Sequence, residues 1–186
     1  ITENLEVSFV NQENDRWGSE PSYGFVGWVK DENSVIVNHK LDLWILPLDE
    51  KDKARSLTQG KSLDDEIRFR VDDQSFRFEE EPKDRYVDLD KPLILNAFST
   101  KTKNAGFYQL SNKKLEKIVF EPASFGSSAW RSGLTKAKNS DVIIYKKGDY
   151  KNYPESFLSN INFSISKRIT QTNPQQENYN WGHRIL

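Results

Sequence analysis

The sequence predicts an all-β protein, and three observations favour this fold class. Short aliphatic runs recur along the 186-residue chain, at residues 35–37, 93–95 and 142–144. Each run is followed by a polar turn, an aromatic-bearing segment and a closing segment, both with the composition of strands. Amphipathic helical patterns are absent, and only residues 123–130 fit a short helical turn. Four strands that recur about every 40 to 50 residues are typical of propeller blades, so we expect about three four-stranded antiparallel blades of a partial β-propeller.

The expected blades divide a single domain over residues 1–186. The first blade covers about residues 23–60, the second about residues 65–122 and the third about residues 131–172, and residues 179–186 begin a further blade. The predicted strands are residues 5–10 before the first blade; 23–29, 35–37, 42–46 and 55–58 in the first; 67–71, 76–78, 93–95, 106–110 and 117–120 in the second; and 132–137, 142–144, 156–161 and 168–170 in the third. An insertion before the second aliphatic run makes the first repeat interval the longer one.

Composition excludes several function classes. The chain has 27 basic and 28 acidic residues, so no overall field attracts nucleic acid or an anionic membrane. No apolar stretch approaches 18 residues, and we expect neither kind of partner. The lysines of residues 101–117 are interpreted as turn residues that keep a sheet edge from pairing, rather than as a nucleic-acid patch.

Metal and cofactor chemistry is not expected either. The chain has no cysteine, which excludes disulfides, thiolate zinc sites and cysteine nucleophiles and leaves the cellular compartment open. The two histidines, His39 and His183, are far apart in the sequence, and no carboxylate stands at ligand spacing from either. We therefore expect no metal site and no cofactor.

Several longer strings carry a family resemblance. They are Asp-Leu-Trp-Ile at residues 42–45, Ser-Leu-Thr-Gln-Gly at 56–60, Asp-Lys-Pro-Leu-Ile-Leu at 90–95, Thr-Lys-Asn-Ala-Gly-Phe-Tyr at 102–108, Lys-Ala-Lys-Asn-Ser-Asp-Val-Ile-Ile-Tyr at 136–145, Arg-Ile-Thr-Gln-Thr-Asn-Pro-Gln at 168–175 and Tyr-Asn-Trp-Gly at 179–182. Together they resemble the propeller region of bacterial serine peptidases of the prolyl oligopeptidase family, of the dipeptidyl peptidase IV type. The resemblance runs over about residues 24–182.

The resemblance implies a parent protein with two domains. Its propeller would filter or position peptide substrates, and a C-terminal α/β-hydrolase domain would hold a Ser-Asp-His triad. The nucleophile of such a triad lies in a Gly-x-Ser-x-Gly turn. The nearest approach here, Gly-Ser-Ser-Ala-Trp at residues 126–130, lacks the second glycine. Because the chain also opens at Ile1 without methionine, we expect a non-catalytic internal fragment of a serine peptidase. The resemblance alone suggests a periplasmic or secreted location.

Glu79 and Glu80 are candidate substrate-binding residues. With Glu81 they resemble the glutamate cluster by which dipeptidyl peptidase IV holds the free amino terminus of a peptide, since carboxylates suit an ammonium ion. The compensating charges of residues 82–85 favour a different interpretation, a solvated and partly self-neutralised turn.

The aromatic residues form two groups. Those at matching points of the predicted strands are expected to pack between blades. They are Trp28, Trp44, Phe107, Tyr108, Phe157 and Trp181. Trp17 and Trp130 lie in loop-like stretches outside the repeat, which makes them candidates for exposed contact with a ligand.

Three functions remain open. The leading one is a propeller segment that gates access to a hydrolase domain, with peptide as the substrate. The alternative is an independent all-β module that binds carbohydrate or protein. A carboxylate glycosidase ranks last, because it needs two acids about 5 to 10 Å apart across a cleft, and the pairs at residues 64–65 and 72–73 have the pattern of turns. Three blades cannot close a ring, so the end blades should expose apolar faces and favour self-association.

Overall fold

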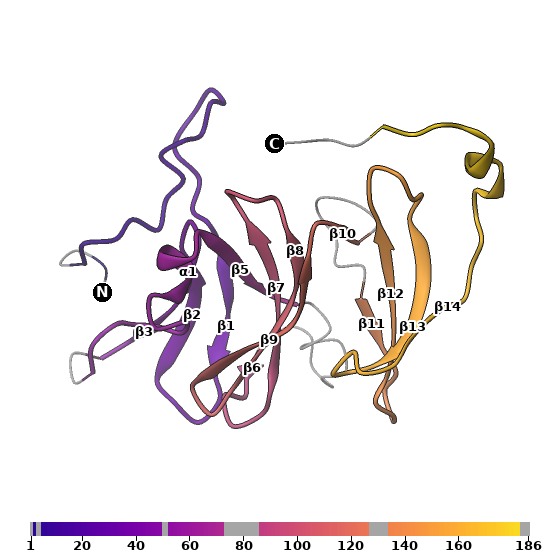
Figure 1. The fold of residues 1–186 in the computed structure, drawn as a ribbon. Helices are drawn as coiled ribbons and strands as arrows, with labels where there is room; N and C mark the ends of the chain where they lie inside the picture. Colours follow the sequence, from indigo (N-terminus) through magenta and orange to yellow (C-terminus); the bar gives the residue numbers. More distant parts are fainter. Residues whose placement is uncertain (1, 3–4, 50–51, 73–85, 127–133, 183–186) are drawn as a thin grey trace.

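The described chain is built from β-strands in three sheets. The computed structural model describes residue 2 and residues 5–49, 52–72, 86–126 and 134–182. Within these ranges the sheets stand side by side in chain order (Figure 1). The predicted all-β fold class is confirmed.

The first sheet is an antiparallel meander with one added strand. β1 (Phe25–Val29), β2 (Ser34–Asn38), β3 (Leu43–Pro47) and the short β4 (Arg55–Ser56) follow one another across the sheet. β6 (Tyr86–Val87) comes from much later in the chain and pairs with β1 in parallel, which gives the order β4-β3-β2-β1-β6.

The second sheet has four antiparallel strands. β5 (Ile67–Val71), β7 (Leu93–Ser99), β8 (Ala105–Ser111) and β9 (Lys114–Glu121) lie in the order β5-β7-β8-β9. The chain leaves this sheet after β5, adds β6 to the first sheet, and returns as β7. The insertion predicted before the second aliphatic run therefore links two sheets.

The third sheet is also antiparallel. β12 (Val142–Gly148) pairs on one side with β13 (Glu155–Asn160), which pairs in turn with β14 (Ser166–Arg168). On its other side β12 pairs with two short strands, β10 (Ser124–Phe125) and β11 (Leu134–Lys136). Two pieces of chain thus fill the position of a single edge strand.

The helices are short. α1 (Lys61–Asp64) follows Gly60, whose φ of 85° suits glycine and turns the chain after β4. A 3₁₀ helix, η2 (Pro174–Asn178), occupies the predicted break after the third sheet, where Pro174 can start a helical turn without losing a needed N–H. Within the described residues, no helix is long and apolar enough to cross a membrane.

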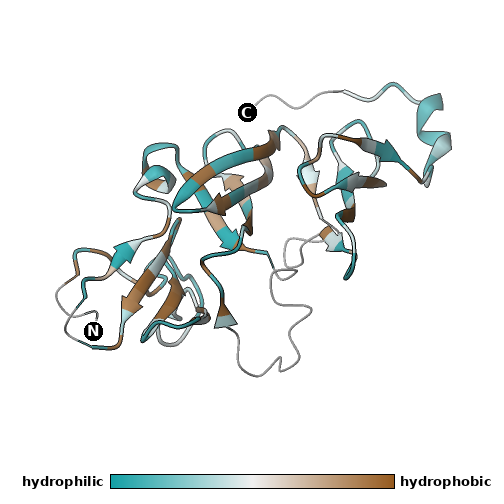
Figure 2. Cartoon of the chain, turned by 90° about the horizontal axis from the view of Figure 1, so that it is seen from below, coloured by the Kyte–Doolittle hydropathy of each residue, from teal (hydrophilic) through white to brown (hydrophobic). Residues whose placement is uncertain are grey.

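Apolar residues lie mainly on the strands and hydrophilic residues on the turns (Figure 2). Apolar side chains fill the space between successive sheets. Those between the first and second sheets are Val26, Val29, Ile36, Leu43, Ile45, Ile67, Phe69, Val87, Leu93, Leu95, Ala97, Tyr108 and Leu110. Those between the second and third are Ile94, Phe107, Leu134, Ile143 and Tyr145, with partly buried neighbours. The second sheet therefore buries both faces, because consecutive residues of a strand point to opposite sides.

The third copy of the repeat is shifted by one residue from the predicted alignment. In β7, Leu93 and Leu95 face the first sheet. In β12 the residue that faces back toward the second sheet is Ile143, in the middle of its triplet, followed by Tyr145. Tyr145 opposite Phe157 thus corresponds to Leu95 opposite Tyr108. A one-residue slip exchanges the two faces of a strand, so Val142 and Ile144 point away from the core.

Some predicted elements are wrong. Residues 5–10 do not form a strand, since only Val10 makes an isolated bridge, to Ser22. The described part of 123–130 contains β10 rather than a helical turn. Residues 179–182 contain no strand. The predicted strand at 76–78 lies outside the described residues.

Candidate functional site

Of the four predicted substrate-binding residues, the structure describes Trp17. Its side chain is fully exposed (104%). It lies in an arm of residues 10–22 that projects from the first sheet (Figure 1). At the base of the arm Asn11 N–H donates to Pro21 O at 2.8 Å. Glu79, Glu80 and Trp130 lie outside the described residues.

His39 has no catalytic partner among the residues described. Its ring is partly buried between Phe9 and Tyr23, at centroid distances of 6.2 and 6.3 Å. Burial lowers the pKa of His39 from its usual value, and Nδ1 has no hydrogen-bond partner. Within the described ranges no group of three or more His, Asp or Glu residues could hold a metal ion.

A buried carboxylate links β3 to β4 at one edge of the first sheet. Asp42, 2% exposed, accepts hydrogen bonds from Ser56 Oγ at 2.5 Å and Thr58 Oγ1 at 2.7 Å. It also accepts one from the N–H of Leu43 at 2.7 Å. The Asp-Leu-Trp and Ser-Leu-Thr strings thus meet in space, with Asp42 as their link.

The third sheet has the same arrangement at the corresponding position. Glu155 precedes Phe157 by two residues, as Asp42 precedes Trp44, and is also buried. The hydroxyl of Thr170 donates to Glu155 Oε2, and Thr172 N–H donates to Oε1 at 2.8 Å. The Thr170 hydrogen bond holds the pKa of Glu155 below its usual value. These carboxylates are occupied in holding strands and are not free for chemistry.

The structure describes three of the four acids of the glycosidase hypothesis. Asp64 ends α1 and Asp65 caps it, which agrees with a turn. Asp72 is fully buried and accepts a hydrogen bond from Asn96 Nδ2 at 2.8 Å. Asp73 lies outside the described residues.

An open pocket of about 550 Å³ lies at one end of the third sheet. It is lined by Lys146, Tyr153, Pro154, Ser156, Thr172, Asn173 and Gln175. Gln176 brings its two walls together, because its Oε1 accepts from Tyr153 N–H at 3.1 Å and its Nε2 donates to Lys151 O at 2.5 Å. Lys146 makes no ion pair with any described residue. The pocket therefore offers one cation, hydroxyls and amides, and the flat ring of Tyr153.

The face of the first sheet that points away from the second is apolar, and we call it the first outer face. It consists of Phe25, Trp28, Val35, Val37, Trp44, Leu46 and Tyr86. A β-bulge between Phe25 and Gly27 puts both Phe25 and Trp28 on this side, with ring centroids 5.8 Å apart. Phe9 covers Trp44 edge-on at 6.0 Å. Phe25, Trp28 and Tyr86 are 50%, 41% and 49% exposed, so Trp28 is not in the predicted core.

The third sheet presents a second outer face on its far side. It consists of Thr135, Val142, Ile144, Lys146, Ser156, Leu158, Asn160 and Lys167. Val142, Ile144 and Leu158 are 39%, 42% and 37% exposed. The pocket at Lys146 is continuous with this face. As predicted, the two end sheets leave apolar side chains in solvent.

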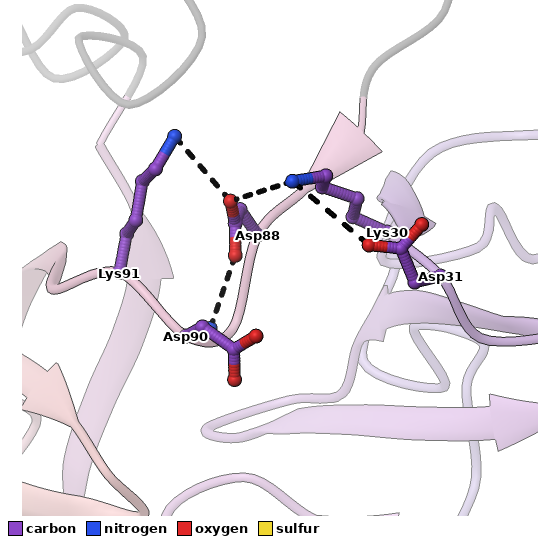
Figure 3. Close-up of polar contacts among 5 residues, drawn as sticks. All are labelled: Lys30, Asp31, Asp88, Asp90 and Lys91. Carbon is purple, nitrogen blue, oxygen red and sulfur yellow. Dashed lines mark hydrogen bonds and ion pairs between the residues drawn. The ribbon is translucent and has the colours of Figure 1, made fainter.

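A charged junction connects the first sheet to the return of the chain toward β7 (Figure 3). Asp88 Oδ2 lies 3.2 Å from Lys30 Nζ and 3.3 Å from Lys91 Nζ, and Oδ1 accepts from Asp90 N–H at 3.1 Å. Lys30 also approaches Asp31 at 3.9 Å. The hydrogen bond from Lys30 lowers the pKa of Asp88. The junction holds β6 in place, and its charges are mutually satisfied.

No protein-family model, curated protein or solved structure matches this chain.

The third sheet thus offers a surface suited to binding. Its pocket combines residues of β12, the 149–154 loop and the segment after β14. Sequence reasoning missed Lys146, Tyr153 and Gln175, because nothing local marks residues that meet only when the chain folds back. The exposed aromatic at Tyr153, between polar turn residues, is the signal that was available.

Proposed function

We propose that this chain is a non-catalytic, three-sheet part of a β-propeller that controls substrate access in a serine peptidase of the prolyl oligopeptidase type. The observation that supports this most is the stacking of three mainly antiparallel sheets in chain order, with a separate apolar core between each two neighbouring sheets. The substrate would be a peptide, and the catalytic partner a C-terminal α/β-hydrolase domain.

The repeated carboxylate link supports the same proposal. Asp42 and Glu155 hold equivalent strand pairs in the first and third sheets, which is expected if the sheets are copies of one unit. The strings that carry the resemblance to the family include Asp42 and its partners Ser56 and Thr58, and on the third sheet the partners Thr170 and Thr172 of Glu155.

Peptide binding is the activity to test on this chain. A proline-containing hexapeptide with a free amino terminus should bind more tightly than its acetylated form, if Glu79 and Glu80 hold the ammonium group. We expect the Glu79→Gln, Glu80→Gln double variant to lose on the order of tenfold in affinity for the free peptide, the worth of one charge-assisted hydrogen bond. Isothermal titration calorimetry measures both affinities.

A matched pair of exposed carboxylates provides the control. The Glu20→Gln, Glu177→Gln double variant removes the same charge and should bind both peptides as the unaltered chain does. Equal affinity of the unaltered chain for the free and acetylated peptides would remove Glu79 and Glu80 from the proposal. No measurable binding of either peptide would count against peptide as the substrate.

An independent carbohydrate- or protein-binding module is the second candidate. The exposure of Trp17 and of Tyr153 beside the pocket favours it, since bare aromatic rings suit stacking on sugars. A shift of tryptophan fluorescence with soluble glycans, lost in Trp17→Ala and absent with the hexapeptide, would establish this candidate over the first.

A further inference from the structure

The first and second outer faces are related by the internal repeat. Leu95 and Tyr108 of the second sheet point back to the first sheet, and Tyr145 and Phe157 of the third point back to the second. The corresponding pair in the first sheet is Val37 and Trp44, which belongs to the first outer face. In the second and third sheets, the equivalent face packs against the sheet that precedes it in the chain. In the first sheet this face is the first outer face.

The second outer face corresponds to the opposite side of the repeating sheet. Ile36 and Ile45 of the first sheet point forward to the second sheet, and Ile94 and Phe107 of the second point forward to the third. In the third sheet the forward-facing residues include Ile144 and Leu158. In the first and second sheets, the equivalent face packs against the sheet that follows it in the chain. In the third sheet this face is the second outer face.

We propose that two copies of the chain associate head to tail, each placing its second outer face on the first outer face of the other. This inference rests on the proposed propeller architecture and continues the sheet stacking that already operates twice within the chain. Two identical contacts would close a ring of six sheets. Such a ring lies within the range of about four to eight blades in which propellers close.

The two faces have complementary chemistry, because the first is apolar and the second combines aliphatic with polar and basic side chains. The strand positions that form the first outer face carry aromatic and aliphatic side chains and no charge. The second outer face carries Lys146 and Lys167, neither of which makes an ion pair within the described ranges. Ammonium groups are attracted to the faces of aromatic rings such as those of Trp28 and Tyr86. If the first outer faces of two copies packed against each other instead, these lysines would have no aromatic ring to contact.

The mass of the protein in solution tests the ring. Light scattering coupled to size exclusion should give twice the 21.7 kDa of one chain over a wide range of concentration. Ile144→Asp on the second outer face and Trp28→Asp on the first should each reduce the mass to that of one chain, because a carboxylate is buried in both contacts. Leu158→Asp and Tyr86→Asp provide a second variant for each face.

Mixing distinguishes head-to-tail contact from every other pairing. The Ile144→Asp chain keeps an intact first outer face, and the Trp28→Asp chain keeps an intact second outer face. An equimolar mixture of these two single-chain proteins should therefore recover a species of two chains, held by one contact. Leu63→Asp, at a residue 50% exposed on α1, is the control and should leave the unaltered mass. Circular dichroism confirms that each variant is folded.

Three results would overturn the inference. An unaltered chain that is monomeric at all concentrations shows that no second copy covers the faces. Open assemblies that grow with concentration show that the ring does not close. A mixture that stays monomeric, or an Ile144→Asp chain that still dimerises, excludes head-to-tail pairing. None of these results affects the peptide-binding test, which a folded monomer can pass.

Discussion

Asp42 shows how a single buried side chain joins two strands that local pattern alone leaves separate. Its carboxylate accepts three hydrogen bonds, from Leu43, Ser56 and Thr58, in a site that water does not reach. β4 contributes only two residues to the sheet, so the ladder between β3 and β4 is short. The hydrogen bonds of the Asp42 carboxylate therefore supply much of the specificity with which β4 pairs with β3.

Replacing this carboxylate should be costly. We expect Asp42→Ala to lower the free energy of unfolding by about 3 kcal/mol, because the two hydroxyls and one N–H lose a buried acceptor. Urea unfolding followed by circular dichroism measures the loss. Asp141→Ala removes an exposed carboxylate and should change the free energy by less than about 0.5 kcal/mol. A similar small change for Asp42→Ala would contradict the role given to it.

His39 should make stability depend on pH above the range in which carboxylates titrate. Burial lowers its pKa in the folded chain, so the unfolded chain binds its proton at a higher pH. The unfolding free energy is therefore unaffected by His39 above about pH 6.5. It should fall as the pH decreases from there toward the lowered pKa of the folded state.

The His39→Gln variant isolates this effect. Unfolding free energies measured from neutral pH down to about pH 5 should decrease in the unaltered chain and stay flatter in the variant. His183 is present in both proteins, so any slope they share belongs to other groups. Parallel curves would show that the ring of His39 does not lose hydration on folding.

At the scale of elements, the second sheet departs from the other two at one position. Gly106 precedes Tyr108 by two residues, where the first and third sheets have Asp42 and Glu155. A Cβ built at Gly106 would lie 1.9 Å from the carbonyl oxygen of Val119. The register of β8 and β9 also shifts next to this point. Close backbone approach replaces the carboxylate link in this sheet.

Gly106→Ala should accordingly destabilise the chain. The new methyl group meets backbone rather than a movable side chain, so we expect a loss of about 3 kcal/mol or failure of β9 to pair. Thermal unfolding measures the first outcome, and amide hydrogen exchange across β9 the second. Gly182→Ala is the matched control, because no atom lies within 4 Å of its added Cβ. A stable Gly106→Ala chain with a protected β9 would be inconsistent with the close approach.

At the scale of the whole molecule, the positions of the longer strands could be predicted from the sequence. Which of their side chains point to the core could be predicted only in part. Aliphatic runs bounded by polar turns predicted β2, β7 and β12 because β-branched residues favour extended backbone. In residues 142–144 all three side chains are apolar, so alternation gives no signal for which of them faces the core. The pairing of Tyr145 with Phe157 decides it, and that is a long-range contact.

Two short elements, β6 and α1, escaped the sequence for a similar reason. β6 is too short for alternation and is extended only because β1 lies beside it. α1 is shorter than the repeat of an amphipathic helix pattern. The pocket depends on Gln176 bridging to the 149–154 loop, which no local motif encodes. Trp17 was predictable as exposed, because its flanking residues are polar and include Gly18.

The excursion of the chain through β6 also orders events during synthesis. Residues 25–56 can form β1 to β4 soon after they leave the ribosome, but the free edge of β1 waits for residues 86–87. Until then the first sheet exposes unpaired backbone groups at an edge that invites pairing with another chain. Because the first two sheets share one core and the third packs on the second through a separate core, we expect the first two sheets to fold together and the third to follow.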